Sequence, residues 1–424
     1  MIAALAIALT LAALSPQATA ARPPSPEASA DKRTISDMRV HGNHSTPDAV
    51  VLELAGVKPG DVATEATPKE IQTRLEKSGR FDRVKVLARS RSLDGSDLSL
   101  VILIEEPVVV PIDMPGGAVV NTVRRVANRP MFLPILDFSD YGFSYGARAS
   151  LVNITGRGSR FSVPFTWGAQ KRAAAEYEHR FGPDRRMRID GAASWMRREN
   201  PFYDIDDTRR DAAAGLSYQI ARPLRAGVRG GVTDVTFGDL GDRFPWFSAE
   251  AIVDTRIDPE LPREAVYGSV CWEHLAFDRY EPANRLRSDV RGYLGLIGQS
   301  VLAVRALHIM SDTTLPPFER ALIGGASTLR GSEFGFATGD NLAAGSVELR
   351  VPVSSPLSMG RLGVNVFADV GAAYDRGIRL RDAEYQWGYG AGLFFSATVF
   401  KLNLDVATDG KGHTRAHLAS GFRF

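Results

Sequence analysis

The sequence predicts an all-β transmembrane barrel of about 16 antiparallel strands, preceded by one small α/β domain. Two observations favour this fold. From about residue 130 onward, the chain divides into short segments that alternate apolar and polar side chains and are separated by turns. After the N-terminal region, the sequence contains no apolar run long enough to form a membrane-spanning helix, which excludes helical spans.

The composition restricts the function classes. The 424 residues include 51 Lys and Arg against 49 Asp and Glu, so the formal net charge is only +2 and gives no electrostatic case for nucleic-acid binding. The single cysteine, Cys271, excludes an internal disulfide and a cysteine-based zinc site. The 40 Gly, 21 Phe and 11 Tyr suit a β-rich protein.

The N-terminus resembles a secretory signal. Residues 2–14 are apolar and are followed by the small-residue site Ala18-Thr19-Ala20, which predicts a signal peptide over residues 1–20. The run is shorter than the roughly 20 residues of a spanning helix, although a buried N-terminal helix stays an alternative. Residues 21–32 contain three prolines and are predicted to be a flexible lead-in.

Residues 33–107 predict a small α/β domain. A short strand begins at Ile35, helices are expected over residues 49–54 and 69–77 with a loop at 58–61 between them, and strands follow from Phe81 and over residues 98–104. Residues 108–129 are then a linker to the barrel, which is expected over residues 130–424.

Three markers in this segment are similar to those of a POTRA domain. They are a Gly-Asn turn with a nearby Thr, a Gly-x-Phe-x-x-Val step, and a last strand that closes on Glu-Pro; the residues are Gly42, Asn43, Thr46, Gly79, Phe81, Val84, Glu106 and Pro107. The resemblance implies a sheet edge that pairs with an unfolded client by strand addition. A generic α/β spacer is the alternative.

The strands of the barrel are predicted from their alternation. In residues 399–407, for example, Leu404 and Val406 lie on one face, and Asn403 and Asp405 lie on the other. Charged side chains in strand after strand would be too costly in a dry core but are acceptable in a wet lumen. Strand centres are expected near residues 134, 146, 164, 176, 191, 214, 231, 251, 271, 291, 305, 347, 367, 392, 403 and 418. The longest connection, from about residue 311 to 341, has no predicted regular structure, and a loop of this length is usually functional.

Motifs near this connection resemble the outer-membrane assembly and translocation superfamily of BamA and TamA. The loop carries Leu329-Arg330-Gly331-Ser332, similar to the Arg-Gly tip of the family's sixth extracellular loop, and Phe367-Ala368-Asp369-Val370-Gly371 is similar to the strand that matches it. The family has an aromatic residue where this chain has Ser332, and Phe334 is a candidate substitute.

The resemblance implies that the loop is fixed inside the barrel by a lock. By parity, Asp369 and Glu348 lie on the polar faces of their strands, so an inward-folded Arg330 can meet both carboxylates. Gly331 and Gly325 allow tight turns near the wall. Leu329, Phe367 and Gly371 are supporting motif residues. An arginine in an ordinary solvated loop is the alternative.

The first and last barrel strands are expected to form a weak seam that acts as a lateral gate, as the resemblance implies. The first contains Pro134, which cannot donate to a ladder, and the last contains Gly421, which weakens its packing. Both features also occur in ordinary strands, which is the alternative. In the last strand Leu418, Phe422 and the terminal Phe424 share one face, and a C-terminal Phe is a familiar assembly signal of outer-membrane barrels.

Two motifs are not interpreted as catalytic. The Gly-x-Ser-x-Gly match at residues 142–146 and the glycine-rich segment at residues 388–392 both lie inside strand patterns, where glycine permits close packing. No metal-site spacing occurs. We therefore expect no enzymatic activity, no catalytic residue, no cofactor and no metal.

The protein is predicted to lie in the outer membrane of a Gram-negative cell, with its POTRA domain in the periplasm. Its predicted function is to assist insertion of outer-membrane proteins or translocation of a client, with membrane lipid and extended client polypeptides as partners. A periplasmic partner protein is left open. A single POTRA domain favours an auxiliary member over the central housekeeping one. A passive porin-like channel and a structural surface barrel remain alternatives.

Overall fold

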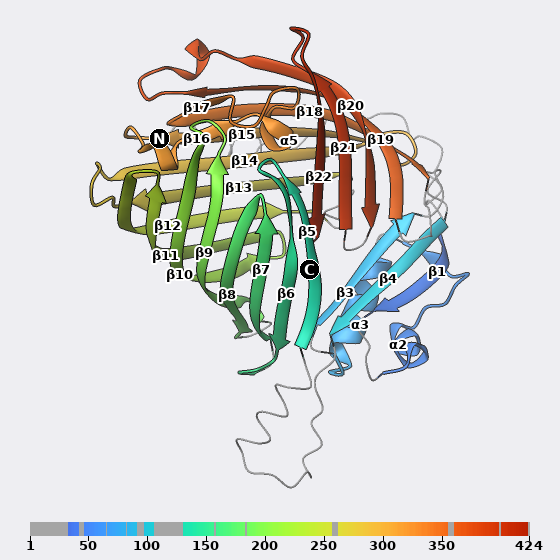
Figure 1. The fold of residues 1–424 in the computed structure, drawn as a ribbon. Coiled ribbons are helices and arrows are strands. Elements are labelled where there is room, and N and C mark those ends of the chain that lie inside the picture. Colours follow the sequence, from blue (N-terminus) through green and yellow to red (C-terminus); the bar gives the residue numbers. More distant parts are fainter. Residues whose placement is uncertain are drawn as a thin grey trace, which may run out of the picture.

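The structure, a computed structural model, describes residues 33–41, 46–64, 66–81, 83–90, 97–105, 130–156, 158–182, 185–256, 262–354, 360–397 and 400–422. These residues form a small α/β unit followed by a large, nearly closed barrel (Figure 1). The predicted signal peptide, the lead-in, the whole linker and the terminal Phe424 lie outside the described residues. Within the described ranges, no helix has the length and apolar character that crossing a membrane requires.

The N-terminal unit is a four-stranded sheet packed against two helices. Its elements are β1 (Arg33–His41), α2 (Asp48–Ala55), β2 (Val62–Ala63), α3 (Thr67–Lys77), β3 (Arg83–Ser90) and β4 (Asp97–Glu105), and the sheet order is β2-β1-β4-β3. Ile71 and Leu75 lie one turn apart on α3 and are fully buried against the sheet residues Leu100 and Ile102. The short strand β2 was not predicted, because two residues are too few to show a periodicity.

The barrel is an antiparallel sheet of 16 strands, which confirms the predicted fold class. Every predicted strand centre falls within an observed strand. The strands are β5 (Pro130–Ser139), β6 (Gly142–Val152), β7 (Ser159–Gly168), β8 (Gln170–Phe181), β9 (Met187–Asn200), β10 (Ile205–Ala221), β11 (Leu224–Phe237), β12 (Leu240–Asp254), β13 (Ala265–Leu275), β14 (Ala283–Gly295), β15 (Val301–Ser311), β18 (Asn341–Ser354), β19 (Gly360–Tyr374), β20 (Gln386–Ala397), β21 (Phe400–Thr408) and β22 (Thr414–Phe422).

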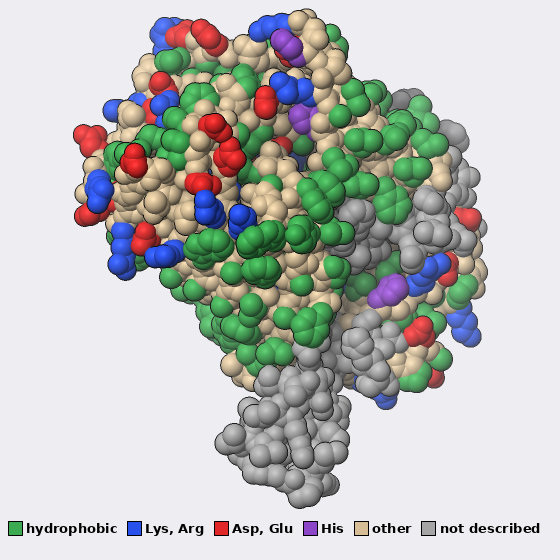
Figure 2. Space-filling view, in the orientation of Figure 1, with side chains coloured by type: hydrophobic (Ala, Val, Ile, Leu, Met, Phe, Trp, Pro, Cys, Tyr) green, Lys and Arg blue, Asp and Glu red, His purple; other side chains and the backbone are tan. Residues whose placement is uncertain are grey.

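The alternation of side chains divides the wall into an apolar outer face and a polar inner face. Val364 and Val366 on β19 are 42% and 51% exposed, whereas the intervening Asn365 is 2% exposed. Hydrophobic side chains gather on the outer surface over β5–β8, and charged side chains gather above them (Figure 2). This is the pattern of a cylinder with lipid outside and polar groups inside.

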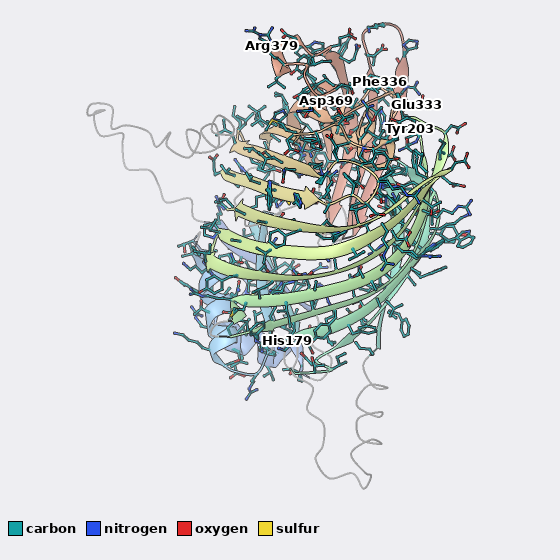
Figure 3. All side chains as sticks on the ribbon, turned by 90° about the vertical axis from the view of Figure 1, so that its left-hand side faces the viewer. His179, Tyr203, Glu333, Phe336, Asp369 and Arg379 are labelled. Carbon is teal, nitrogen blue, oxygen red and sulfur yellow. The ribbon has the colours of Figure 1, made fainter. Side chains whose placement is uncertain are left out.

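The two ends of the barrel are distinguished by the chain path. We call the end at which β5 begins the entry end and the opposite end the far end. Because successive strands alternate in direction, the connections β9–β10 and β15–β18 lie at the far end, and β8–β9 lies at the entry end. Figure 3 shows this separation, since Tyr203, Glu333, Phe336 and Arg379 lie near its top and His179 near its bottom.

The connection between β15 and β18, residues 312–340, is called the long loop. Contrary to the prediction, it has regular structure of its own: η2 (Pro317–Glu319), β16 (Ala321–Ile323), α5 (Gly325–Thr328) and β17 (Ala337–Gly339). β16 and β17 pair as a small hairpin, and the buried side chains of Ile323 and Leu329 pack with Leu307 and Leu342 of the wall. These pieces are too short for a periodicity to predict them.

Candidate functional site

The tip of the long loop folds into the barrel and places Arg330 against the inner wall. Leu329 and Arg330 are 0% and 6% exposed. Gly331, the next residue, has φ +94°, and a Cβ there would lie 2.8 Å from the Thr408 carbonyl group. Only glycine fits this conformation and this close approach, so the Arg-Gly order is required for the turn.

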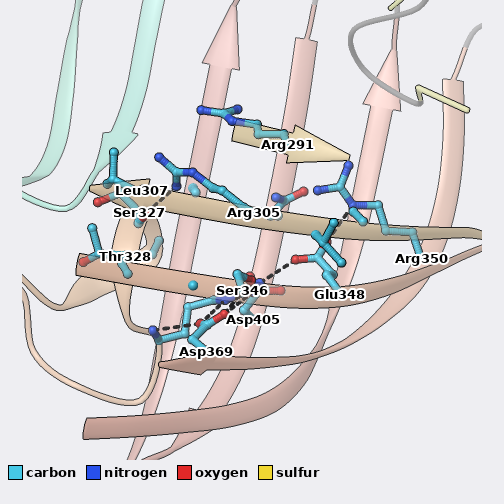
Figure 4. Close-up of a pocket in the computed structure, with 18 of the residues that line it drawn as sticks. Arg291, Arg305, Leu307, Ser327, Thr328, Ser346, Glu348, Arg350, Asp369 and Asp405 are labelled. Carbon is cyan, nitrogen blue, oxygen red and sulfur yellow. Dashed lines mark hydrogen bonds and ion pairs between the residues drawn. The ribbon is translucent and has the colours of Figure 1, made fainter. Parts of the chain in front are cut away.

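The Arg330 guanidinium binds three carboxylates that come from three strands. The carboxylates are those of Glu348, Asp369 and Asp405, which Figure 4 labels. Nε and Nη2 donate to the two oxygens of Asp369 on β19 at 2.8 and 2.9 Å. Nη1 donates to Glu348 on β18 at 2.8 Å and to Asp405 on β21 at 3.2 Å. The backbone N–H of Arg330 also donates to Asp369 at 3.1 Å. Sequence parity placed two of these carboxylates toward the lumen; Asp405 was on a predicted polar face but was not included in the site.

The electrostatic environment keeps Arg330 charged. Burial alone would lower its pKa, but hydrogen bonding and charge from Asp369, together with Glu348 and Asp405, raise the pKa above its ordinary value. The guanidinium carbon also lies 3.3 Å from the centroid of the Phe367 ring, within range of a cation–π contact. Around the group, Ser346 donates to Asp369 at 2.7 Å, and Arg350 donates to Glu348 at 2.7 Å. The cluster can hold a loop firmly, but it presents no activated nucleophile.

The glycine-rich segment at residues 388–392 is the surface that receives the loop tip. A Cβ at Gly388 on β20 would lie 1.7 Å from the Arg330 carbonyl oxygen, and one at Gly390 would lie 2.9 Å from the Phe367 ring. The prediction that these glycines permit close packing agrees with these distances. A Cβ added at Gly371 on β19 would likewise lie 2.7 Å from Cδ1 of Ile323 in the long loop.

The base of the long loop is held at a second point on another part of the wall. Glu319 accepts hydrogen bonds from Arg209 on β10 at 2.7 Å and from Arg285 on β14 at 2.9 Å. The neighbouring Phe318 is buried among the rings of Phe244 and Phe277, with centroid distances of 6.4 and 6.1 Å. No sequence motif had indicated this anchor, because its partners lie far apart in the chain.

The first and last strands, β5 and β22, meet without a backbone ladder among the described residues. In the described part of the two strands, the Ser420 side chain connects them instead. The Ser420 hydroxyl accepts a hydrogen bond from the Phe138 N–H at 3.0 Å and donates to the Leu136 carbonyl at 3.2 Å. These bonds show that even-numbered residues of β5 direct their backbone groups toward β22. Pro134 therefore removes a donor on the side that faces β22, where it costs no bond to β6.

The long loop contacts both sides of this seam. On the β5–β6 turn, Asp140 accepts a hydrogen bond from the Ala326 N–H at 2.6 Å, and the Tyr141 ring packs edge-on against Phe334 at 4.9 Å. On β22, His417 Nε2 accepts a hydrogen bond from the Gly331 N–H at 3.3 Å. Phe334 thus contacts the β5–β6 turn and does not join Phe367 beneath Arg330. Asp140 and Ser420 were not predicted, because such contacts depend on how the cylinder closes.

The remaining predicted residues are distributed as follows. Gly79 ends the α3 segment with φ +66°, and Phe81 is 7% exposed in the core of the N-terminal unit. Leu418 lies on the outer face of β22 and is 38% exposed. Gly421 and Phe422 belong to β22. Gly42, Asn43, Glu106 and Pro107 lie outside the described residues. Among the described residues, no group of three or more His, Cys, Asp or Glu side chains could hold a metal ion.

Comparison with known families gives two matches along the chain. Residues 153–424 match the Omp85 superfamily domain, and residues 33–106 match the surface antigen variable number repeat of the POTRA type. A search of curated protein sequences gave no match.

Solved structures share the fold at low sequence identity. BamA from Haemophilus ducreyi lacking POTRA domains 1–3 is 13% identical with a TM-score of 0.59, and the match covers 92% of this chain and 84% of that one. CdiB from Escherichia coli is 13% identical with a TM-score of 0.52, over 97% of this chain and 93% of the other. CdiB from Acinetobacter baumannii is 12% identical with a TM-score of 0.50, over 99% and 96% of the two chains.

Proposed function

Because the chain belongs to the Omp85 superfamily, whose barrels handle polypeptide clients in the outer membrane, we propose that it inserts or translocates a client through the seam between β5 and β22. In this proposal the POTRA domain lies in the periplasm at the entry end. The client is first held there as an extended strand and then pairs at the seam. Strand pairing satisfies backbone groups that lipid would leave unpaired.

The observation that carries the proposal is the construction of the seam. Adjacent barrel strands elsewhere are joined by ladders, such as the nine paired positions of β21 and β22. Between β5 and β22, the Ser420 hydroxyl makes the two hydrogen bonds described above. A contact of this kind can part at much lower cost than a ladder, and parting exposes two strand edges that a client can pair with.

The POTRA sheet supplies the candidate site of first contact. β2 pairs with β1 at Arg33 and Thr34, and Ile35 exchanges backbone hydrogen bonds with Gly60 and Asp61. Among the described residues, β1 has no strand partner on this side beyond Ile35. β3 is the other edge of the sheet, with β4 as its partner. An extended client strand can add to such an edge through main-chain hydrogen bonds.

A disulfide across the seam tests the proposal. Cys271 is first replaced by Ser, and cysteines are then introduced at Leu136 and Ser420. We expect client assembly in proteoliposomes to stop when the pair is oxidised and to resume on reduction, whereas each single-cysteine variant stays active. Normal assembly by the oxidised double variant would show that the seam does not open for the client.

Conductance distinguishes this function from that of a passive channel. With the long loop docked in the lumen, we expect small, fluctuating currents in planar bilayers and larger ones after Arg330→Ala. A large, steady current from the wild-type protein would instead favour the porin-like alternative.

A further inference from the structure

A second polar cluster lines the lumen on the wall formed by β6–β11, separate from the docking site of the long loop. Five arginines from five strands surround a cavity of about 290 Å³, and the carboxylates between them come from β8 and β9. The arginines are Arg148, Arg160, Arg172, Arg188 and Arg229. They alternate along their strands with outward residues such as Val163, Ile189 and Val228, so the sheet itself directs them inward.

The five arginines of the cluster have only three carboxylates as partners, so the cluster carries a net positive charge. Glu178 binds both Arg160 at 2.7 Å and Arg188 at 3.2 Å. Glu176 is shared in the same way between two arginines, and Asp190 binds the fifth. Five guanidinium groups against three carboxylates leave an excess of two positive charges on this part of the wall.

The acidic side chains of the cluster are on the whole less exposed than the arginine side chains. The three acidic side chains are 13–25% exposed, and the five arginine side chains are 23–43% exposed. The acids bind the guanidinium groups at their terminal nitrogens, and the arginine side chains are the more exposed members of the cluster. A group that enters the lumen meets cationic, planar donors that suit carboxylates.

We propose that this wall binds an acidic stretch of an extended polypeptide client. This inference rests on the proposed function and names a property of the segment that the lumen accepts. The cluster extends over six adjacent strands, about 24 Å at the usual strand spacing, which is the length of about seven extended residues. Several carboxylates of one segment can therefore contact the arginines at the same time.

Binding of a fluorescent octaglutamate peptide to the full-length protein in detergent micelles tests the inference. Fluorescence anisotropy should show saturable binding that weakens as salt rises, and an octalysine peptide should not bind. Arg160→Gln and Arg188→Gln should each weaken binding about two- to fivefold, the range for partly exposed charge pairs.

The Glu178→Gln variant is expected to change binding in the opposite direction. It therefore distinguishes an effect on peptide binding from a general loss of folding, which would only weaken binding. This variant keeps both arginines and removes the carboxylate between them, so it should bind octaglutamate more tightly. Arg379→Gln, in the exposed β19–β20 connection, removes the same charge as the test variants and should leave binding unchanged. Each variant is checked for folding by the heat-dependent shift of the barrel on gels.

Two results would overturn the inference: equal octaglutamate affinity in the wild type and both arginine variants, or weaker binding by Glu178→Gln. Neither of these two results bears on the proposed opening of the seam, because peptide binding in micelles requires no membrane insertion. Conversely, an oxidised seam that still assembles clients would refute the proposed function and leave the peptide affinity as measured.

Discussion

Replacement of Arg330 by alanine should release the tip of the long loop. The substitution leaves three carboxylates facing one another, with Asp369 and Asp405 only 2% and 5% exposed in their side chains. Breaking a buried ion pair by removing one partner typically costs about 3–5 kcal/mol. If this cost falls on docking alone, the population of the undocked loop rises roughly a hundredfold to a few thousandfold.

Proteinase K cleavage within residues 312–340 measures this population, because cleavage follows the open fraction when reclosing is fast. Asp369→Ala should have a smaller effect, since Arg330 then retains Glu348 and Asp405. Arg379→Ala serves as a control, because the Arg379 side chain is 68% exposed. If Arg330→Ala is cleaved at the wild-type rate, the ion cluster does not hold the loop.

Three further outcomes are expected. Gly388→Ala should increase cleavage of the long loop, because its Cβ would lie 1.7 Å from the Arg330 carbonyl; Gly268→Ala, with no atom within 4 Å of its Cβ, should not, and equal cleavage rates would contradict this reasoning. Ser420→Ala should accelerate hydrogen exchange of the Phe138 amide, and an unchanged exchange rate would mean that the hydroxyl does not protect it. Acidification should loosen the base of the loop. Burial raises the pKa of Glu319, but Arg209 and Arg285 outweigh it and hold the pKa below the ordinary 4.5. The stabilisation is therefore complete above about pH 4.5 and lost as pH falls through the folded value. Hydrogen exchange of the backbone amides at positions 318 and 319 should show this pH dependence in the wild type and not in Glu319→Gln.

The strands could be predicted because their signal is local. A lipid-facing side chain such as Val366 and a lumen-facing one such as Asn365 differ in polarity at each step, so the alternation marks both the strand and its faces. The same parity placed Asp369 and Glu348 toward the lumen. The short elements β2, β16 and β17 carry no comparable signal, since two or three residues can form a strand only because a neighbour is already in place.

The contacts that close the barrel could not be derived in this way. Ser420 and Phe138 are 282 positions apart, and nothing near Ser420 in the sequence shows that its hydroxyl meets β5. Glu319 likewise depends on arginines 110 and 34 positions away. Such contacts follow from the circumference and tilt of the whole cylinder, which single segments do not encode.

The two attachments of the long loop make it a chord across the cylinder. One end is fixed to β10 and β14, and the other to β18, β19 and β21. This chord braces the arc of wall between its ends against changes in curvature. Among the described residues, the arc from β5 to β9 has no comparable tie to the loop beyond the contacts of the β5–β6 turn. A change of cross-section should therefore be taken up there, by strands that swing outward as a flap while the braced arc keeps its shape.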